Sequence, residues 1–85
     1  MNETYSVELK KSAVKDLKKI PRADAVRIAQ KLKKLENNLT GDVKQLTNFT
    51  PEYRLRVGNW RVLFEIQENT IIVYRIKHRR HAYSG

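Results

Sequence analysis

The sequence has no cysteine, and it has few of the residues that interrupt regular structure: three glycines and two prolines in 85 residues. Without cysteine there is neither a disulfide nor a thiolate ligand for zinc, so packing or a partner chain must hold so small a domain together. No run of about 18 uncharged apolar residues is present, which argues against a membrane span. We therefore expect a cytoplasmic protein with a single domain over residues 1–85.

Acidic residues are scarce as well. The chain has 18 lysines and arginines against 9 aspartates and glutamates, a formal charge of +9 and a pI near 10.1. Beyond Glu68 no acidic side chain follows. This imbalance indicates a polyanionic partner, with nucleic acid as the leading candidate because phosphate contacts release counterions. Many of the lysines in the N-terminal half need only solvate helices. The basic side chains within residues 53–85 are Arg54, Arg56, Arg61, Arg75, Lys77, Arg79 and Arg80.

The first half of the chain predicts one strand followed by two helices. Residues 5, 7 and 9 are hydrophobic and alternate with polar ones, the period of a half-buried strand. Ser12 is predicted to cap a first helix, which ends near Ile20 because the residue before Pro21 is kept out of the helical conformation. Pro21 is expected to open a second helix at its first turn. That helix is marked by Ala25, Ile28, Ala29, Leu32, Leu35 and Leu39 and is expected to end at Asn37, Asn38 and Gly41.

The second half changes to the period of strands. After a polar connection that contains Leu46 and Phe49, residues 53–57, 60–67 and 70–77 are predicted as strands. The pairs Gly58-Asn59 and Glu68-Asn69 are the expected turns between them. We therefore predict an α+β fold: an N-terminal strand, a two-helix hairpin and an antiparallel sheet of three to four strands.

The hairpin turn at residues 58–59 predicts two different faces. It pairs Arg56 with Arg61 and places Arg54 on the same side. Like charges directly opposed in a sheet are destabilising, and a phosphate between them would remove the repulsion and accept paired hydrogen bonds. The alternative is a solvated face whose arginines only keep the chain soluble. The other side of the hairpin is expected to pack on the helices through Leu55, Val57, Trp60, Val62 and Phe64.

Two segments, YRLRVGNWRVLFEI (53–66) and IIVYRIKHRRHAY (71–83), resemble the C-terminal signature of the RelE/ParE toxins, and YSVELKKSAVKDLKKIP is similar to the start of that family. The resemblance implies the RelE-like order of elements and a toxin of a type II toxin–antitoxin system. RelE members cleave messenger RNA in the ribosomal A site without a metal or other cofactor, whereas ParE members inhibit DNA gyrase. The ending HRRHAY favours the RelE activity, an endoribonuclease that inhibits translation.

The resemblance also implies a set of functional residues. Catalytic positions fall on Arg54, Arg56, Arg61, Arg79 and Tyr83, and RNA-binding positions on Lys77, Arg80 and His81; no metal ligands are implied. Family members often carry lysine at positions 54 and 56, and arginine is a poor general base because it stays protonated. The two histidines at 78 and 81 titrate near neutrality and are candidate bases, or else they are exposed tail residues or phosphate contacts. For the tyrosine, the alternative is a packed terminal aromatic.

The expected partners are a cognate antitoxin, the ribosome and messenger RNA, with no membrane. The toxin–antitoxin complex is expected to bind its own operator DNA through the antitoxin. Two other functions remain open: a ParE-like gyrase inhibitor without nuclease activity, and a basic RNA-binding module. The exposed aromatic motif of common RNA-binding sheets is not visible in this sequence. There is no glycine-rich phosphate loop, and Ser12 and Ser84 have no evident activating base.

Overall fold

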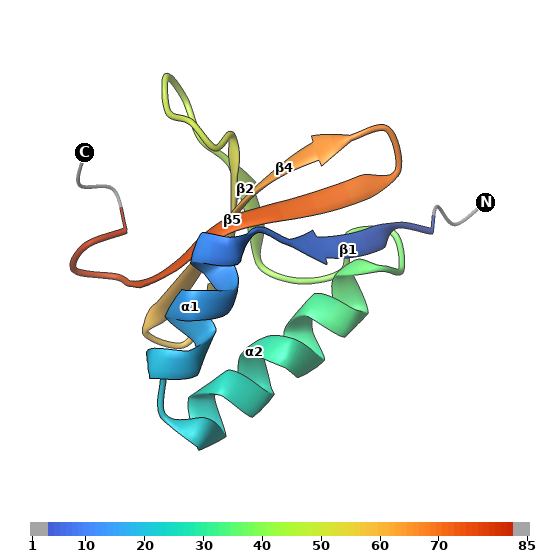
Figure 1. The fold of residues 1–85 in the computed structure, drawn as a ribbon. Coiled ribbons are helices and arrows are strands. Elements are labelled where there is room, and N and C mark those ends of the chain that lie inside the picture. The colour runs from blue at the N-terminus through green and yellow to red at the C-terminus, as the bar shows by residue number, and fades with distance from the viewer. Residues whose placement is uncertain (1–3, 83–85) are drawn as a thin grey trace.

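The computed structural model describes residues 4–82, which form five strands and two helices. The strands lie in the order β1-β5-β4-β3-β2; β1 is parallel to β5, and the other neighbours are antiparallel. Figure 1 shows both helices on the same side of this sheet. The predicted α+β class, with a strand, two helices and then an antiparallel sheet, is confirmed. The elements are β1 (Ser6–Leu9), α1 (Lys11–Lys19), α2 (Arg22–Leu35), β2 (Val43–Gln45), β3 (Tyr53–Val57), β4 (Trp60–Gln67) and β5 (Thr70–His78).

The helix boundaries correct three predictions. α2 ends at Leu35, and Leu39, which was expected on this helix, lies beyond it with φ of 56°. The N-cap of α1 is Lys10, and Ser12 is the second residue of the helix, with its hydroxyl donating to the carbonyl of Tyr74 instead. Pro21 is the N-cap of α2 and not its first helical residue. The helix end at Ile20 is confirmed, since this residue is extended with ψ of 140°. Lysines fill the last turn of both helices, where they complement the negative end of the helix dipole.

The sheet contains one strand that the sequence analysis assigned to a polar connection. This strand, β2, pairs with β3 and places Lys44 directly opposite Arg54. The bounds of β3 and β4 are as predicted, and their register pairs Arg56 with Arg61. Gly58, in the turn between them, has φ of 57°, a left-handed conformation that glycine adopts without steric cost.

The core lies between the helices and the sheet. Phe64, Ile28 and Leu35 are among its largest fully buried side chains. Trp60 is half-buried, and its indole N–H donates to Asp24 of α2 at 3.0 Å. A fully buried side chain of the size of Phe64 stabilises the fold by roughly 2–3 kcal/mol. The buried cluster comprises Ala13, Ile20, Ile28, Leu32, Leu35, Leu55, Val57, Val62, Phe64, Ile71, Val73 and Ile76.

A β-bulge changes the phase of β5. Leu63 pairs with Arg75 but Phe64 pairs with Val73, so the register skips Tyr74. Before the bulge Val73 is buried on the helix side, and after it Ile76 is buried there. Strict alternation from Val73 would have placed Lys77 on the helix side. The bulge therefore turns Lys77 to the opposite face, where it pairs with Arg61.

Side chains of α1 complete the edge of β5 where β1 ends. The last pair of the parallel ladder joins Leu9 to Val73. Beyond it, the Ser12 hydroxyl donates to the Tyr74 carbonyl at 2.9 Å, and the Asp16 carboxylate accepts the Ile76 N–H at 2.9 Å. These bonds satisfy backbone groups that an unpaired strand edge would expose. Ser12 and Asp16, one turn apart on α1, thus bond to the β5 backbone where a neighbouring strand would otherwise pair.

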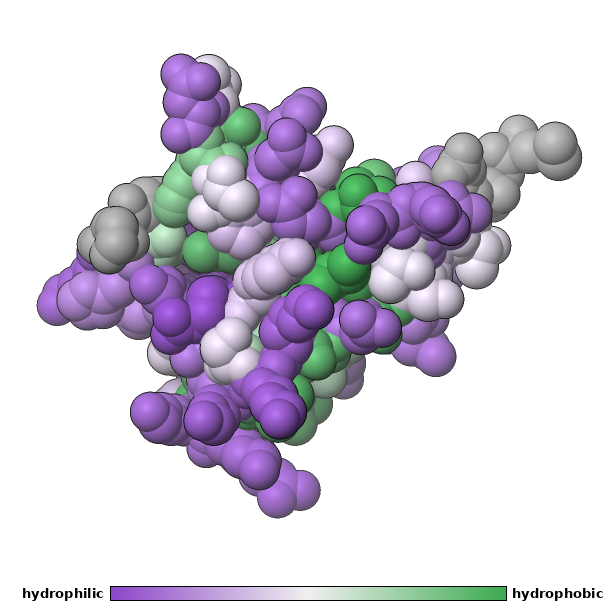
Figure 2. Space-filling view, turned by 45° about the horizontal axis from the view of Figure 1, so that its top comes forward, coloured by the Kyte–Doolittle hydropathy of each residue, from purple (hydrophilic) through white to green (hydrophobic). Residues whose placement is uncertain are grey.

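The surface is mainly hydrophilic. Figure 2 shows hydrophilic side chains over most of one face of the molecule, with hydrophobic side chains gathered between them. Some apolar exposure is expected in a chain of this size, because its polar surface cannot cover the whole fold. In the part of the chain that the structure describes, neither helix is long and apolar enough to cross a membrane. The exposed large hydrophobic residues are Val14, Val26 and Tyr74.

Candidate functional site

The face of the sheet opposite the helices carries two rows of cations. The first cation row consists of Arg56, Arg61 and Lys77, which are directly opposed on β3, β4 and β5. The second cation row consists of Lys44 and Arg54, opposed on β2 and β3. Each directly opposed pair of like charges costs a few tenths to about 1 kcal/mol. Such repulsion between neighbouring strands favours an anion as the ligand of this face.

One carboxylate reaches both rows. Asp42, in the connection before β2, lies 3.3 Å from Arg54 and 3.4 Å from Arg56. Its backbone carbonyl also accepts a hydrogen bond from Arg54 at 3.0 Å. The Arg54 side chain is only 14% exposed, so these contacts hold its guanidinium in a fixed position. Arg56 is 58% exposed and remains open to a ligand. Asp42 therefore orders the two arginines and only partly neutralises the rows.

The hairpin turn brings Arg61 and Arg79 together. The guanidinium of Arg61 donates to the carbonyls of Gly58 and Trp60, at 2.9 and 3.0 Å. The backbone N–H of Arg79 donates to the carbonyl of Asn59 at 2.8 Å. The start of the C-terminal tail is therefore fastened to the turn that holds Arg61. The same turn therefore contacts two predicted site residues that are well separated in the sequence, Arg61 through its side chain and Arg79 through its backbone.

His78 lies on the helix side of the sheet, away from the cation rows. It pairs with Trp60, and the two rings meet edge to face with centroids 5.4 Å apart. Its Nδ1 accepts the backbone N–H of Arg80 at 3.3 Å, and its carbonyl accepts the N–H of His81 at 2.8 Å. This position makes His78 a support for the tail and leaves His81 as the better placed of the two candidate bases.

The remaining predicted site residues follow His78. Arg80 and His81 are exposed in the turn after β5. Ala82, next to them, is buried and anchors the end of that turn. Tyr83 lies outside the described residues. The structure thus collects Arg54, Arg56, Arg61 and Lys77 on one face and fastens the backbone of Arg79 to the turn at its end.

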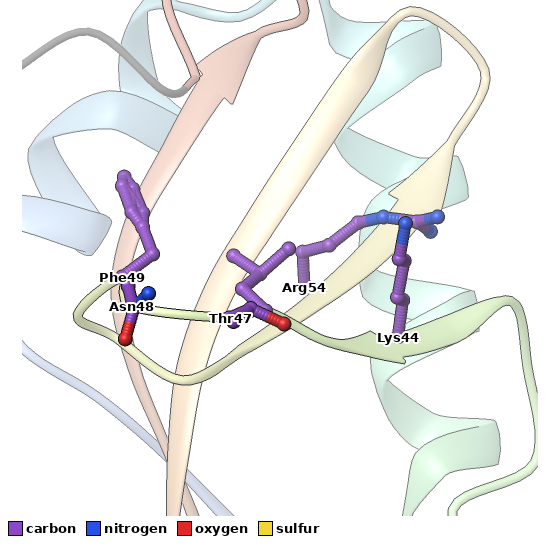
Figure 3. A pocket seen from close by; sticks show the side chains of 6 residues that line it. Lys44, Thr47, Asn48, Phe49 and Arg54 are labelled. Atoms are coloured by element: carbon purple, nitrogen blue, oxygen red, sulfur yellow. The ribbon is translucent and has the colours of Figure 1, made fainter.

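Lys44 belongs to the second cation row, and the sequence analysis did not predict it. Its strand is three residues long and falls in a polar stretch, so it does not stand out from a loop. The sequence offers one alternation there, the apolar Val43 followed by the charged Lys44. In the structure Val43 is half-buried and Lys44 is exposed. Beside Lys44 and Arg54 is a pocket of about 570 Å³, whose other walls come from the connection between β2 and β3. Figure 3 shows the two cations at one end of this pocket and Asn48 and Phe49 at the other.

Asp16 and Arg75 form an ion pair next to the first cation row, and each shifts the pKa of the other. Burial raises the pKa of Asp16, but hydrogen bonds from Arg75 and from the Ile76 N–H, with the charges of Arg75 and Lys77, outweigh it and lower that pKa below 3.8. The Asp16 hydrogen bond in turn raises the pKa of Arg75. Arg75 thus stabilises the sheet edge through its bonds to Asp16, whereas Lys77 belongs to the first cation row.

This arrangement can bind and stabilise anions. Arginine presents a rigid fork of N–H donors that fits phosphate oxygens, and it stays charged at all physiological pH values. Fixed cations of this kind stabilise negative charge that develops on a reacting phosphate, because they need no reorganisation during the reaction. A general base must come from elsewhere, since arginine does not release its proton.

Comparisons with known proteins find similarity to toxins of toxin–antitoxin systems and to their complexes with antitoxins. The family model described as "ParE toxin of type II toxin-antitoxin system, parDE" matches residues 7–83. Over 78 residues the chain is 36% identical to Toxin RelE3 of Methanocaldococcus jannaschii. The aligned region covers 86% of this chain and 89% of that relative. A chain of the RelB-RelE antitoxin-toxin complex from Methanococcus jannaschii superposes with a TM-score of 0.74 at 33% identity, covering 89% of this chain and 94% of that one. A chain of the archaeal RelE-RelB complex from Pyrococcus horikoshii OT3 gives 0.75 at 29% identity, covering 93% and 99%.

Proposed function

Because the chain belongs to the RelE/ParE superfamily of toxins of type II toxin–antitoxin systems, we propose that it is a ribosome-dependent endoribonuclease that cleaves messenger RNA in the A site. The observation that carries this proposal is the first cation row. The sheet register holds three cations from three strands directly opposite one another, and Asp42 offsets only part of their repulsion. RNA supplies the phosphate that removes it, and cleavage of the message inhibits translation.

The chemistry is an internal displacement at phosphorus. The 2′ oxygen attacks the phosphorus, the bond to the 5′ oxygen breaks, and the products are a cyclic 2′,3′-phosphate and a free 5′-hydroxyl. The proton leaves the 2′-hydroxyl for a base, and another proton reaches the departing 5′ oxygen. No metal is needed, because fixed cations stabilise the extra charge on the phosphate. In this scheme Arg56, Arg61 and Arg79 stabilise that charge directly, and Arg54 supports them with its positive charge from the second cation row. Lys77, Arg80 and His81 hold the RNA.

We assign the role of general base to His81 in the tail. His81 is exposed and follows directly on Arg79 and Arg80, and histidine exchanges protons near neutral pH. His78 instead acts on the tail from the helix side, because its Nδ1 already accepts the Arg80 N–H. Tyr83, outside the described residues, is proposed to stack on a base or to orient the reactive phosphate. Alignment of the RNA on the rigid sheet supplies much of the remaining acceleration.

The test is primer extension on a message that purified ribosomes translate. The wild-type chain is expected to produce cuts at A-site spacing, and a message without a start codon is expected to remain intact. Arg61→Ala should reduce the cleavage rate about 100-fold, the range for loss of one charge-stabilising donor. Arg22→Ala, which removes an exposed arginine at the start of α2, is the matched control and should cleave like the wild type.

A second variant protects the result against misfolding. Arg61 also donates to two carbonyls of its own hairpin, so its loss affects the turn as well as the charge. Arg56→Gln removes a side chain that is 58% exposed and costs little stability. Unchanged cleavage in both variants, with folded protein, would reject the first cation row as the site.

Inhibition of DNA gyrase is the second candidate function. The observation that favours it is the description of the matching family model, which carries the ParE name. A gyrase inhibitor would block supercoiling by purified gyrase and leave a translated message intact. The relatives with RelE names favour cleavage instead. Running the supercoiling and primer-extension assays on the same protein preparation decides between the two.

A cognate antitoxin is the proposed protein partner. Two of the similar solved structures are complexes of a RelE chain with RelB. We expect the partner of this chain to present an acidic or amphipathic segment to the basic face, because electrostatic complementarity speeds such encounters. The resulting complex is proposed to bind its operator DNA through the antitoxin. Copurification from cells that express both chains, followed by cleavage assays of the complex, tests the first part.

A further inference from the structure

The connection between β2 and β3 forms the wall of a pocket on the same face as the cation rows. The Leu46 N–H donates to the Glu52 carbonyl at 2.6 Å, which closes this connection into a loop. The Glu52 N–H in turn lies 3.3 Å from a carboxylate oxygen of Glu65 on β4. The loop is therefore fastened at its base and to the sheet. The pocket of about 570 Å³ beside it is lined by Lys44, Leu46, Thr47, Asn48, Phe49 and Arg54.

The pocket combines three kinds of chemistry in a definite order. Lys44 and Arg54 lie together at one end, and Asn48 and Phe49 lie at the other (Figure 3). The cations fit an anion, the ring and the leucine fit a flat apolar group, and the amide and hydroxyl fit polar edges. A nucleotide carries these three features in the same order: a phosphate, and a base whose flat faces are apolar and whose edges form hydrogen bonds.

We propose that this pocket binds the nucleotide next to the one that is cleaved, with its phosphate on Lys44 and Arg54 and its base against the loop. The inference rests on the proposed function, because the first cation row must hold the scissile phosphate. It adds a second nucleotide site, and with it a source of sequence preference. Asn48 and Thr47 read the edge of the base, and Phe49 and Leu46 contact its face.

The spacing of the rows supports this arrangement. Arg54 and Arg56 are two residues apart on β3, so the rows are separated by roughly 7 Å. This distance is comparable to the step between successive phosphates of an extended RNA strand. Asp42 holds Arg54 in place before any ligand arrives, so little ordering is needed on binding. The volume lies within the range of small-molecule sites, roughly 300–1,000 Å³, and suits one nucleotide.

Two carboxylates, those of Asp42 and Glu65, border the site. Asp42 lies 3.3 Å from Arg54 and lowers the net charge of the second row by one. Glu65 contacts the loop at Glu52 and holds its carboxylate toward the backbone. Neither carboxylate lines the pocket. The net charge of the second cation row with Asp42 is still positive, as a phosphate site requires.

The first arm of the test measures binding without cleavage. The full chain, labelled with nitrogen-15, is titrated with a short RNA whose 2′ positions are all methylated, so that it cannot be cut. The amide signals of residues 44, 46–49 and 54 are expected to shift together with those of the first cation row. Lys44→Gln should weaken binding about three- to tenfold, whereas Lys34→Gln, an exposed lysine of α2, should weaken it less than about twofold.

A titration with pyrophosphate separates an RNA site from a plain anion site. Pyrophosphate has the charge of the backbone but no base, so it is expected to shift Lys44 and Arg54 and to leave residues 46–49 unchanged. Equal shifts of the loop with pyrophosphate and with RNA would overturn the proposal. Shifts confined to the first cation row with RNA would overturn it as well.

The second arm measures base preference in primer extension over many codons. Thr47→Val removes the hydroxyl at nearly constant volume and should change the ratio of cleavage between preferred and disfavoured codons at least threefold. Thr47→Ser, which keeps the hydroxyl, is the matched comparison. A wild type that cleaves, with the same codon ratios in both variants, would overturn the pocket but not the proposed function. A wild type that never cleaves, yet binds RNA through residues 46–49, would overturn the proposed function but not the pocket.

Discussion

The carboxylate of Asp16 holds the guanidinium of Arg75 through two hydrogen bonds, of 2.8 and 3.1 Å, across 59 residues of sequence. The same carboxylate accepts the backbone N–H of Ile76. One side chain of α1 thus fixes both the edge of β5 and a cation that would otherwise add to the repulsion near Lys77. The contact distinguishes Arg75, which supports the fold, from the cations of the two rows.

Replacement of Asp16 by asparagine is expected to lower the free energy of unfolding at pH 7 by about 1–2 kcal/mol. Hydrogen bonds between charged groups are worth more than this, but Arg75 is 44% exposed and solvent screens the pair. Chemical denaturation followed by circular dichroism measures the change. Glu8→Gln, which removes an exposed carboxylate of β1, is the control and should have little effect.

The stability that Asp16 provides should depend on pH. Its pKa in the folded chain is below the ordinary value of 3.8, so the contribution is complete above that value and is lost as the pH falls through the folded pKa. The difference between wild type and Asp16→Asn is therefore expected to shrink in strong acid. A difference that is constant over the whole acid range would contradict the assigned ion pair.

Asp42→Asn is expected to strengthen the binding of a methylated, uncleavable RNA. The carboxylate competes with phosphate for Arg54 and Arg56, at 3.3 and 3.4 Å. Because a partly exposed ion pair is worth up to about 1 kcal/mol, the affinity should rise up to about fivefold at low salt. Fluorescence anisotropy at several salt concentrations measures this rise. Weaker binding would mean that Asp42 acts mainly by ordering the arginines.

The salt dependence of RNA binding reports how many cations contact phosphates. For single strands, each contact adds about 0.7 to the slope of log affinity against log salt. Lys77→Gln should lower the slope by about that amount, because the bulge in β5 places this side chain beside Arg61. Lys19→Gln, at the exposed end of α1, should leave the slope unchanged. Equal slopes for all three proteins would remove Lys77 from the binding face.

His78 is expected to position the tail through its Nδ1. Asparagine can present an oxygen near the place of Nδ1, whereas glutamine reaches the place of Nε2. We therefore expect His78→Asn to protect the Arg80 amide from hydrogen exchange better than His78→Gln or His78→Ala does. In the cleavage assay, His78→Gln and His78→Ala should lose about tenfold in kcat/KM and His78→Asn should recover most of it. Equal behaviour of the three variants would assign His78 to packing against Trp60 alone.

Much of the fold followed from local patterns. The bounds of β3 and β4 and the pairing of Arg56 with Arg61 came from a two-residue turn and strict alternation, which the structure confirms. The end of α1 at Ile20 followed from the proline after it. These predictions succeed because each rests on steric or pairing constraints that act within a few residues. The roles of the individual site residues stay predictions.

The errors come from residues whose partners are distant in sequence. Ser12 looks like a helix cap, but its hydroxyl binds the carbonyl of Tyr74, 62 residues away. β2 is too short to show a period, so Lys44 and its position opposite Arg54 were missed. The role of Asp42 as the anion between the arginines depends on the path of the same connection. Local propensity cannot choose among such partners because only packing brings them together.

The sequence by itself determined that the hairpin of β3 and β4 has an arginine face and an apolar face, because side chains alternate along a strand. Only the tertiary structure decided which other cations join that face. Apolar positions at Ile71, Val73 and Ile76 break the alternation of β5, and the core accepts all three only if a bulge absorbs the extra residue. Burial of Ile76 therefore turns Lys77 outward beside Arg61, and the cost of exposing that isoleucine fixes the composition of the first cation row.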